Sequence, residues 1–159
     1  MNKEQTQNLI KELIEKTGVV VNKISITQET PTNTWFGVEV NEPHFFLGRD
    51  AEALYALNHL VRRMVEGKMP SMETKSEFGN GILVDINGYQ QKRVDDVRAV
   101  AHMMSERARY FKSNIEVNPM SAFERRILHE FLSDAVDLKT ESVGLGNTRR
   151  VVIKYVGAI

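Results

Sequence analysis

Arg125, Arg126 and His129 stand close together in the C-terminal half of the chain, and their side chains could hold an anion. On a helix, Arg125 and His129 are four residues apart and therefore neighbours on the surface. An arginine presents a planar fork of donors, and a histidine can donate or accept a proton. The trio therefore suits a phosphate, although a solvated, charged helix face would show the same spacing.

The residues around this trio predict the helix that would position it. Ser121 and Glu124 have the spacing of a capping box, in which each side chain bonds the other residue's backbone amide. At about 100° per residue, the apolar residues form one arc that would face a core. These residues are Phe123, Ile127, Leu128, Phe131 and Leu132. The three basic side chains fall on the other arc.

A second basic group, Arg149, Arg150 and Lys154, lies in the last predicted strand. If this strand adjoins the helix, its cations would extend the positive path that begins at Arg125 and His129. From Gly88 onward the chain holds 12 Lys and Arg against 9 Asp and Glu. The modest basic excess therefore lies in the half that contains both groups.

The composition of the 159 residues excludes several classes of protein. The 21 Lys and Arg balance 21 Asp and Glu, which argues against a protein that coats nucleic acid but permits a local basic patch. The absence of cysteine excludes disulfides, thiolate metal sites and a cysteine nucleophile. No run of about 18 apolar residues occurs, and the start lacks the apolar core of a signal peptide. We therefore expect a cytoplasmic protein without membrane insertion.

Catalysis is the weakest of the alternatives. Glu124, His129 and Asp134 could form an acid–base set, but Glu124 is better explained as the capping-box residue. The sequence contains no phosphate-binding loop, metal-ligand spacing or nucleophile motif. We expect a protein that is not an enzyme and that has neither a metal site nor a cofactor.

The spacing of apolar residues predicts an alternation of helices and strands. Helices are expected at 2–16, 51–66 and 90–112, besides the one after Ser121. Strands are expected at 19–28, 35–40, 82–87, 115–117, 138–143 and 149–156. A turn at 30–33 would join the first two strands, and 67–81 is expected to form an extended loop. This order predicts an α+β fold.

The first half resembles the bacterial-type (type II) KH domain, whose GxxG turn holds a nucleic-acid backbone. Here the turn is Gly48-Arg49-Asp50-Ala51, so the first glycine is present and alanine replaces the second. Gly48 and Arg49 are the candidate contacts. Ala51 would add a methyl group and Asp50 a negative charge beside the phosphate. The alternative is that Gly48 only makes the turn and Asp50 caps the helix.

The second half resembles a domain named for an Arg-x-x-x-His motif, the RxxxH domain, with helices packed on a small β-sheet. The matching blocks are Asn118-Pro119-Met120, Phe123 to His129, Thr140-Glu141-Ser142-Val143-Gly144 and Arg149 to Ile153. A KH-like domain at 1–87 followed by an RxxxH domain at 88–159 is similar to the arrangement of the bacterial Jag (KhpB-like) family.

This resemblance implies binding of single-stranded RNA, or of single-stranded DNA, by a post-transcriptional regulator linked to the cell envelope. It also implies a small, separate KH-domain protein as a partner. The implied nucleic-acid contacts are Arg125, His129, Arg126, Arg149, Arg150 and Lys154. The competing hypothesis is a protein-interaction module that pairs with the small KH protein and binds little RNA itself.

Overall fold

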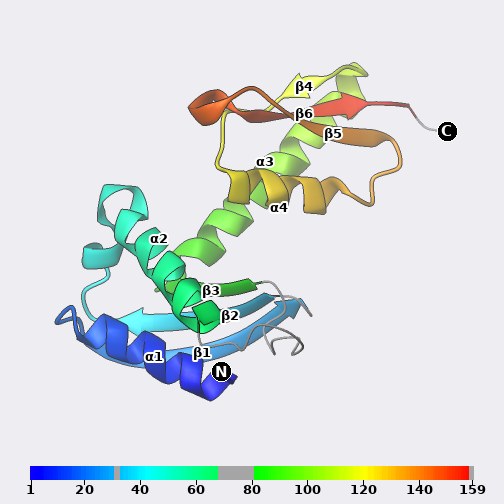
Figure 1. The fold of residues 1–159 in the computed structure, drawn as a ribbon. Helices are drawn as coiled ribbons and strands as arrows, with labels where there is room; N and C mark the ends of the chain where they lie inside the picture. Colours follow the sequence, from blue (N-terminus) through cyan, green and yellow to red (C-terminus); the bar gives the residue numbers. More distant parts are fainter. Residues whose placement is uncertain (31–32, 68–80, 158–159) are drawn as a thin grey trace. The chain divides into compact units, whose positions relative to one another are not determined.

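The computed structural model describes residues 1–30, 33–67 and 81–157, and it shows an α+β chain (Figure 1). The α+β class is therefore confirmed. The chain divides into two compact units, Met1–Gln90 and Gln91–Ile159. The turn expected at 30–33 and the loop expected at 67–81 include residues 31–32 and 68–80, which lie outside the described part of the chain.

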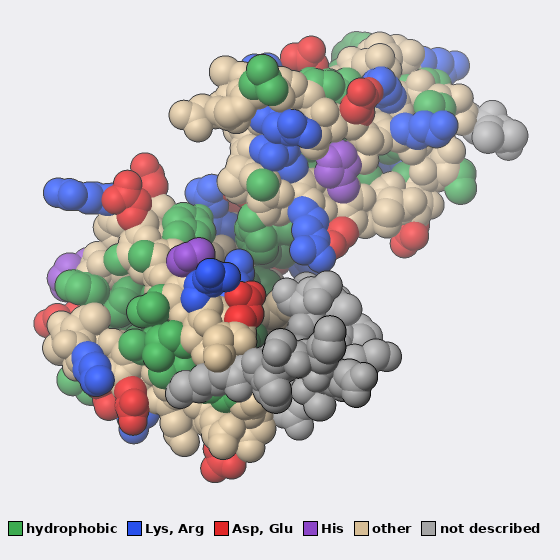
Figure 2. Space-filling model, in the orientation of Figure 1, with side chains coloured by type: hydrophobic (Ala, Val, Ile, Leu, Met, Phe, Trp, Pro, Cys, Tyr) green, Lys and Arg blue, Asp and Glu red, His purple; other side chains and the backbone are tan. Residues whose placement is uncertain are grey.

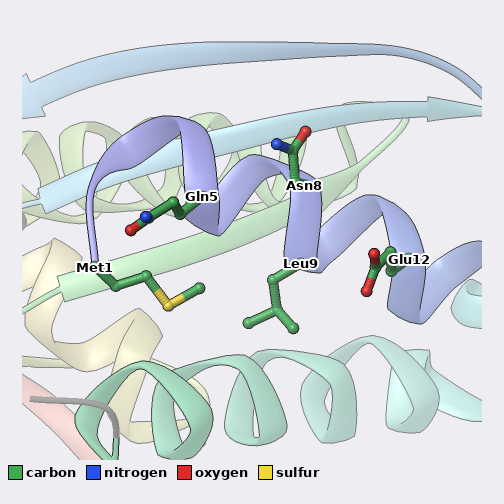
Figure 3. A pocket seen from close by; sticks show the side chains of 5 residues that line it. All are labelled: Met1, Gln5, Asn8, Leu9 and Glu12. Carbon is green, nitrogen blue, oxygen red and sulfur yellow. The ribbon is translucent and has the colours of Figure 1, made fainter.

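The N-terminal unit is a three-stranded sheet covered by two helices. Its elements are α1 (Lys3–Glu15), β1 (Val21–Thr30), β2 (Asn33–Val40), α2 (His44–Gly67) and β3 (Gly81–Ile86), with strand order β1-β2-β3. β1 and β2 pair antiparallel, as expected of a hairpin, whereas β2 and β3 pair parallel. A parallel pair needs a crossover connection, and α2 belongs to it. α1 and α2 lie side by side against the sheet (Figures 1 and 3).

A buried amide fixes α2 to the neighbouring strand. Asn58 is 5% exposed, and its Nδ2 donates to the carbonyl oxygen of Val84 at 2.9 Å. The amide of Val84 donates in return to Asn58 Oδ1 at 2.8 Å. Because buried polar groups are costly unless they are hydrogen-bonded, this reciprocal pair holds α2 in one register along β3. Apolar residues of both helices and all three strands form the core of this unit.

α2 is interrupted at residues 48–51, the turn after which the sequence predicted that this helix would begin. The backbone leaves the helix at Gly48, and the next three residues, Arg49, Asp50 and Ala51, have φ of 49°, 57° and 61°. Left-handed backbone is disfavoured for residues with a Cβ, so this turn is strained. Asp50 has no side-chain hydrogen bond within the described residues, so the expected cap is not formed.

The division between the units falls inside α3 (Tyr89–Phe111). The chain turns at Gly88, where we expected the boundary, but the start of the helix still belongs to the N-terminal unit. Tyr89 packs against that unit's core, and the amide of Gln90 donates to Asp85 Oδ1 at 2.7 Å. These contacts place the division after Gln90.

The C-terminal unit contains the rest of α3 and a small antiparallel sheet. Its other elements are β4 (Ile115–Glu116), α4 (Ala122–Leu132), β5 (Leu138–Val143), the short 3-10 helix η1 (Gly146–Thr148) and β6 (Arg150–Tyr155), with strand order β4-β6-β5. α4 packs on β5 and β6. A bidentate ion pair joins α3 to the start of β5: Arg109 Nε lies 2.7 Å from Asp137 Oδ2, and its Nη2 lies 3.0 Å from Oδ1.

Candidate functional site

The start of α4 is fixed by the capping box that the sequence predicts. The amide of Glu124 donates to Ser121 Oγ at 3.3 Å, and the amide of Ser121 donates to Glu124 Oε2 at 2.8 Å. Arg93 also donates to Glu124. Burial alone would raise the pKa of Glu124, but the Ser121 hydrogen bonds and the charge of Arg93 lower it below its ordinary value. Glu124 is therefore a structural carboxylate and not a free acid or base.

The apolar arc of α4 is narrower than predicted. Ile127, Leu128 and Leu132 are buried, as expected. The prediction is wrong for Phe123 and Phe131, whose exposed fractions are 37% and 44%. The helix is a single layer on a small sheet, and only the centre of its apolar arc meets that sheet. The two phenylalanines flank the contact.

His129 lies between two hydroxyl groups of β5. Its Nδ1 is 2.6 Å from Thr140 Oγ1, and its Nε2 is 3.0 Å from Ser142 Oγ. Thr140 and Ser142 are two residues apart on a strand, so both side chains point to the same face. Burial lowers the pKa of His129, and the nearby charge of Arg125 lowers it further. The imidazole is therefore neutral at pH 7.

The side chain of Arg125 and the backbone of Arg149 both bond to Met120. Arg125 Nη1 donates to the carbonyl oxygen of Met120 at 2.8 Å, and the amide of Met120 donates to the carbonyl oxygen of Arg149 at 3.2 Å. Both arginine side chains are half-buried. Arg149 Nε is inaccessible to water and has no hydrogen-bond partner in the described structure. Arg125, His129, Thr140, Ser142 and Arg149 are called the Arg125–His129 cluster below.

No carboxylate in the described residues pairs with either arginine of this cluster. The other candidate cations of this unit, Arg126, Arg150 and Lys154, each pair with a glutamate. Figure 2 shows Lys and Arg side chains at several places on the face of this unit that is in view. In the cluster, Arg125 donates to a neutral backbone carbonyl, and the charges of Arg125 and Arg149 are not compensated by a carboxylate within the described residues.

A glycine forms the turn between β5 and Arg149. Gly144 has φ of +91°, and a Cβ built on it would lie 3.1 Å from the carbonyl oxygen of Thr148 and 3.3 Å from the Cα of Arg149. A side chain there would meet backbone that cannot move aside without opening the turn. Arg149 itself lies just before β6, and not within the strand as predicted.

Arg150 and Lys154 lie on the other face of the sheet from the cluster. In the antiparallel register, Thr140 is opposite Ile153 and Ser142 is opposite Val151. Directly opposed residues point to the same face, and successive residues alternate. Arg150 and Lys154, which flank these positions, therefore point away from His129. Arg150 pairs with Glu116 at 3.4 Å, and Lys154 pairs with Glu141.

Arg126 is also separated from the cluster, although it is adjacent to Arg125 in the chain. It is exposed, and its Nε donates to Glu130 Oε1 at 2.9 Å, one turn along α4. The structure therefore brings Arg125 close to His129, and it ties the backbone of Arg149 to Met120, which the side chain of Arg125 contacts. It does not bring Arg126, Arg150 or Lys154 to the cluster.

Gly48 and Arg49 are both exposed in the turn of the N-terminal unit. A Cβ built on Gly48 meets nothing within 4 Å, so the space beside this residue is open. Ala51 is fully buried, so its methyl group points into the core. The methyl group therefore does not block the outer side of the turn, contrary to the expectation from the sequence.

Other places in the described structure offer less chemistry. A surface pocket along α1 is lined by Met1, Gln5, Asn8, Leu9 and Glu12 (Figure 3). None of these residues is basic, and Met1 and Leu9 pack against the core. No group of three His, Cys, Asp or Glu side chains suited to a metal occurs in the described ranges. No helix among those same residues has the length and hydropathy to span a membrane.

Sequence reasoning did not single out Thr140 and Ser142 as site residues. The available signal was their alternation on a predicted strand, which puts both hydroxyls on one face. What the sequence could not supply was the contact to His129, 11 and 13 residues away.

The C-terminal unit matches a known domain family. Residues 95–155 match the family of RxxxH (Arg-x-x-x-His) domains, and this segment contains the whole cluster. The chain is 25% identical over 139 residues to the RNA-binding protein KhpB of Bacillus subtilis (strain 168), covering 86% of this chain and 64% of that protein. It is 23% identical over 155 residues to the RNA-binding protein KhpB of Clostridium symbiosum, covering 95% of this chain and 67% of that protein. The chain thus spans about two thirds of the length of these curated relatives.

Proposed function

We propose that this protein binds single-stranded RNA through the Arg125–His129 cluster, without catalysis. The observation that carries the proposal is the charge of Arg125, which lies near His129 and has no carboxylate partner within the described residues, inside the segment that matches the RxxxH domain family. Arg149 also has no carboxylate partner within the described residues and lies in the same segment. The names of the two relatives, both RNA-binding proteins, favour RNA as the ligand. The combination of a KH-like domain with an RxxxH domain, as in the Jag family, belongs to the same proposal.

The geometry suggests different roles for the two motif residues. Arg125 uses one N–H for Met120, which fixes the guanidinium, and its remaining donors are available to a phosphate. His129 uses both ring nitrogens for the hydroxyls of β5. We therefore assign the phosphate contact to Arg125, with Arg149 beside it, and give His129 the role of holding Thr140 and Ser142 in place.

The experiment compares two adjacent arginines by fluorescence anisotropy with a labelled single-stranded RNA. Arg125→Met removes the proposed phosphate donor and keeps the aliphatic stem. Because a hydrogen bond to a charged group contributes about 1.5–3 kcal/mol, we expect affinity to fall about tenfold or more. Arg126→Met removes an equal charge from the exposed face that pairs with Glu130, and its affinity should stay near the wild type.

Thermal unfolding of both variants serves as the control for folding. Equal affinities of the wild type and a folded Arg125→Met variant would contradict the proposal. No binding by the wild type would favour the second candidate function below.

The second candidate is a protein-interaction module in the N-terminal unit. Its helix α2 carries large apolar side chains at the surface: Tyr55 is 46% exposed and Leu60 45%. A small KH-domain protein is the partner that the resemblance implies. Size-exclusion chromatography with light scattering, with and without such a protein, tests the pairing. A mass equal to that of the free chain in both runs would count against it.

The turn at Gly48 and Arg49 is a further proposed RNA contact, since both residues are exposed and the adjacent space is open. The cytoplasmic location expected from the composition and the link to the cell envelope implied by the resemblance stay predictions.

A further inference from the structure

The hydrogen bonds of His129 restrict what its two hydroxyl partners can offer to a ligand. A neutral imidazole has one N–H, which donates, and one bare nitrogen, which accepts. His129 contacts Thr140 Oγ1 at 2.6 Å through Nδ1 and Ser142 Oγ at 3.0 Å through Nε2. One of these hydroxyls must therefore accept from His129, while the other donates to it. This holds for either tautomer.

The two hydroxyls consequently differ in the hydrogen bonds that they can still make to a ligand. The hydroxyl that accepts from His129 keeps its own O–H and can donate to a ligand. The hydroxyl that donates to His129 uses its only hydrogen in that bond, so it can only accept a further hydrogen bond through its lone pairs. No other hydrogen bond of the Thr140 or Ser142 side chain occurs within the described residues. One member of the pair can therefore be satisfied only by a group that donates.

We propose that this acceptor-only hydroxyl receives the 2′-hydroxyl of a ribose, and that the Arg125–His129 cluster thereby distinguishes RNA from DNA. The inference rests on the proposed function. A phosphodiester has no donor, so the DNA backbone cannot satisfy the hydroxyl. The RNA backbone carries a 2′-hydroxyl, which both donates and accepts, at every nucleotide.

The spacing of the two hydroxyls supports separate contacts along a strand. Residues that are two positions apart on a β-strand are separated by about 6.6 Å along the strand, which is too far for one ligand hydroxyl to bond both side chains. The hydroxyl that keeps its O–H can donate to a neighbouring phosphate, whose charge Arg125 and Arg149 attract. The acceptor-only hydroxyl then accepts a hydrogen bond from the 2′-hydroxyl of the adjacent sugar. The acidic side chain between them, Glu141, points to the other face and pairs with Lys154.

The first test needs no protein variant. Anisotropy with wild-type protein compares three labelled single strands of one sequence: RNA, RNA with 2′-fluoro sugars, and DNA. Fluorine cannot donate a hydrogen bond, and 2′-fluoro sugars keep an RNA-like ring shape. We expect RNA to bind about three- to tenfold more tightly than either analogue, the worth of about one hydrogen bond. Equal affinity for RNA and 2′-fluoro RNA would overturn the inference.

The second test removes the hydroxyls. Thr140→Val with Ser142→Ala removes the phosphate contact for every strand and the 2′-hydroxyl contact for RNA alone. RNA should therefore lose about three- to tenfold more affinity than 2′-fluoro RNA and DNA, and the three strands should then bind about equally. Ser113→Ala, which removes an exposed hydroxyl outside the cluster, is the matched control. An equal loss for all three strands would overturn the inference, because both hydroxyls would then serve only the phosphate or the fold.

The two proposals fail in different ways. A wild-type protein that binds none of the three strands overturns both. One that binds RNA and DNA alike, in an Arg125-dependent manner, overturns only the recognition of the 2′-hydroxyl. Thermal unfolding of the double variant shows whether this variant folds. If it does not fold, the comparison of the three strands with the wild-type protein alone tests the recognition of the 2′-hydroxyl.

Discussion

At the scale of single residues, the partner of a cation decides what that cation can bind. Arg125 and Arg126 are identical in type and adjacent in the chain, but one donates to a backbone carbonyl and the other to Glu130. A carboxylate within hydrogen-bond distance already neutralises a guanidinium, so a phosphate gains less by approaching it. The residue without a carboxylate partner is therefore the better candidate for an anion contact.

His129 predicts how stability depends on pH. Its pKa in the folded protein lies below the ordinary value of 6.5, through burial and the charge of Arg125. The unfolded chain therefore binds more protons in the range between the two pKa values. The stabilisation is complete above about pH 6.5 and is lost as pH falls through the lowered pKa. Urea unfolding of the wild type at a series of pH values that starts above 6.5 and continues below it measures this loss.

The control for this prediction is His129→Gln, which cannot titrate in that range. We expect the free energy of unfolding of this variant to depend less on pH between 6.5 and 5 than that of the wild type. Parallel pH profiles for the two proteins would show that His129 is not the group responsible.

At the scale of elements, α4 is positioned from its first turn. The reciprocal bonds of Ser121 and Glu124 satisfy backbone amides that would otherwise lack partners, and Arg93 adds a third bond to the same carboxylate. Arg125 follows directly after this cap and donates back to Met120. The capping box therefore fixes the helix end nearest to the proposed phosphate contact.

Loss of the cap should destabilise the C-terminal unit without touching the cluster. Ser121→Ala removes the hydroxyl that accepts from Glu124, and we expect a loss of about 1 kcal/mol in the free energy of unfolding. Chemical denaturation followed by circular dichroism measures this loss, with Ser113→Ala as a control for removal of an exposed hydroxyl. An unchanged unfolding midpoint for Ser121→Ala would contradict the assigned role of the cap.

The interrupted start of α2 gives a prediction about the other unit. Ala51 is fully buried, so Ala51→Gly removes a methyl group from the core and not from the outer surface of the turn. We therefore expect RNA affinity to stay unchanged in this variant. Gly48→Ala adds a methyl group to the open side instead, where nothing lies within 4 Å, and should also leave the fold intact.

Anisotropy with labelled RNA compares these two variants. Tighter binding by Ala51→Gly would show that the methyl group does obstruct the ligand. Weaker binding by a folded Gly48→Ala variant would support the proposed contact at this turn, because a backbone that approaches Gly48 closely has no room for a Cβ.

At the scale of the whole molecule, zero net charge limits the electrostatic part of binding. If Arg125 and Arg149 supply the phosphate contacts, about two counterions are released. The logarithm of the binding constant should then fall with the logarithm of salt concentration with a slope of about −1.4 for a single strand. Arg125→Met should make this slope shallower by about 0.7, whereas Arg150→Met, on the other sheet face, should not change it.

Salt titrations of the three proteins measure these slopes. A much steeper wild-type slope would mean that further cations, such as Arg150 and Lys154, contact the strand despite their acidic partners. An unchanged slope in Arg125→Met would remove Arg125 from the phosphate contact.

The sequence by itself determined the α+β class, the helix after Ser121 with its capping box, and the bounds of the strand at 138–143. These features are local, because a cap, a turn or an apolar period involves residues a few positions apart. The buried centre of α4 was predictable for the same reason, while the exposure of Phe123 and Phe131 depended on how much of the helix the sheet covers.

Only the tertiary structure decided which cations share a face. Arg149, Arg150 and Lys154 look equivalent in the sequence, but the register of β5 on β6 sends Arg150 and Lys154 away from His129. The contacts of His129 to Thr140 and Ser142 likewise depend on how α4 packs on β5. Strand register and helix packing are set by contacts between residues far apart in the chain, and no local pattern encodes them.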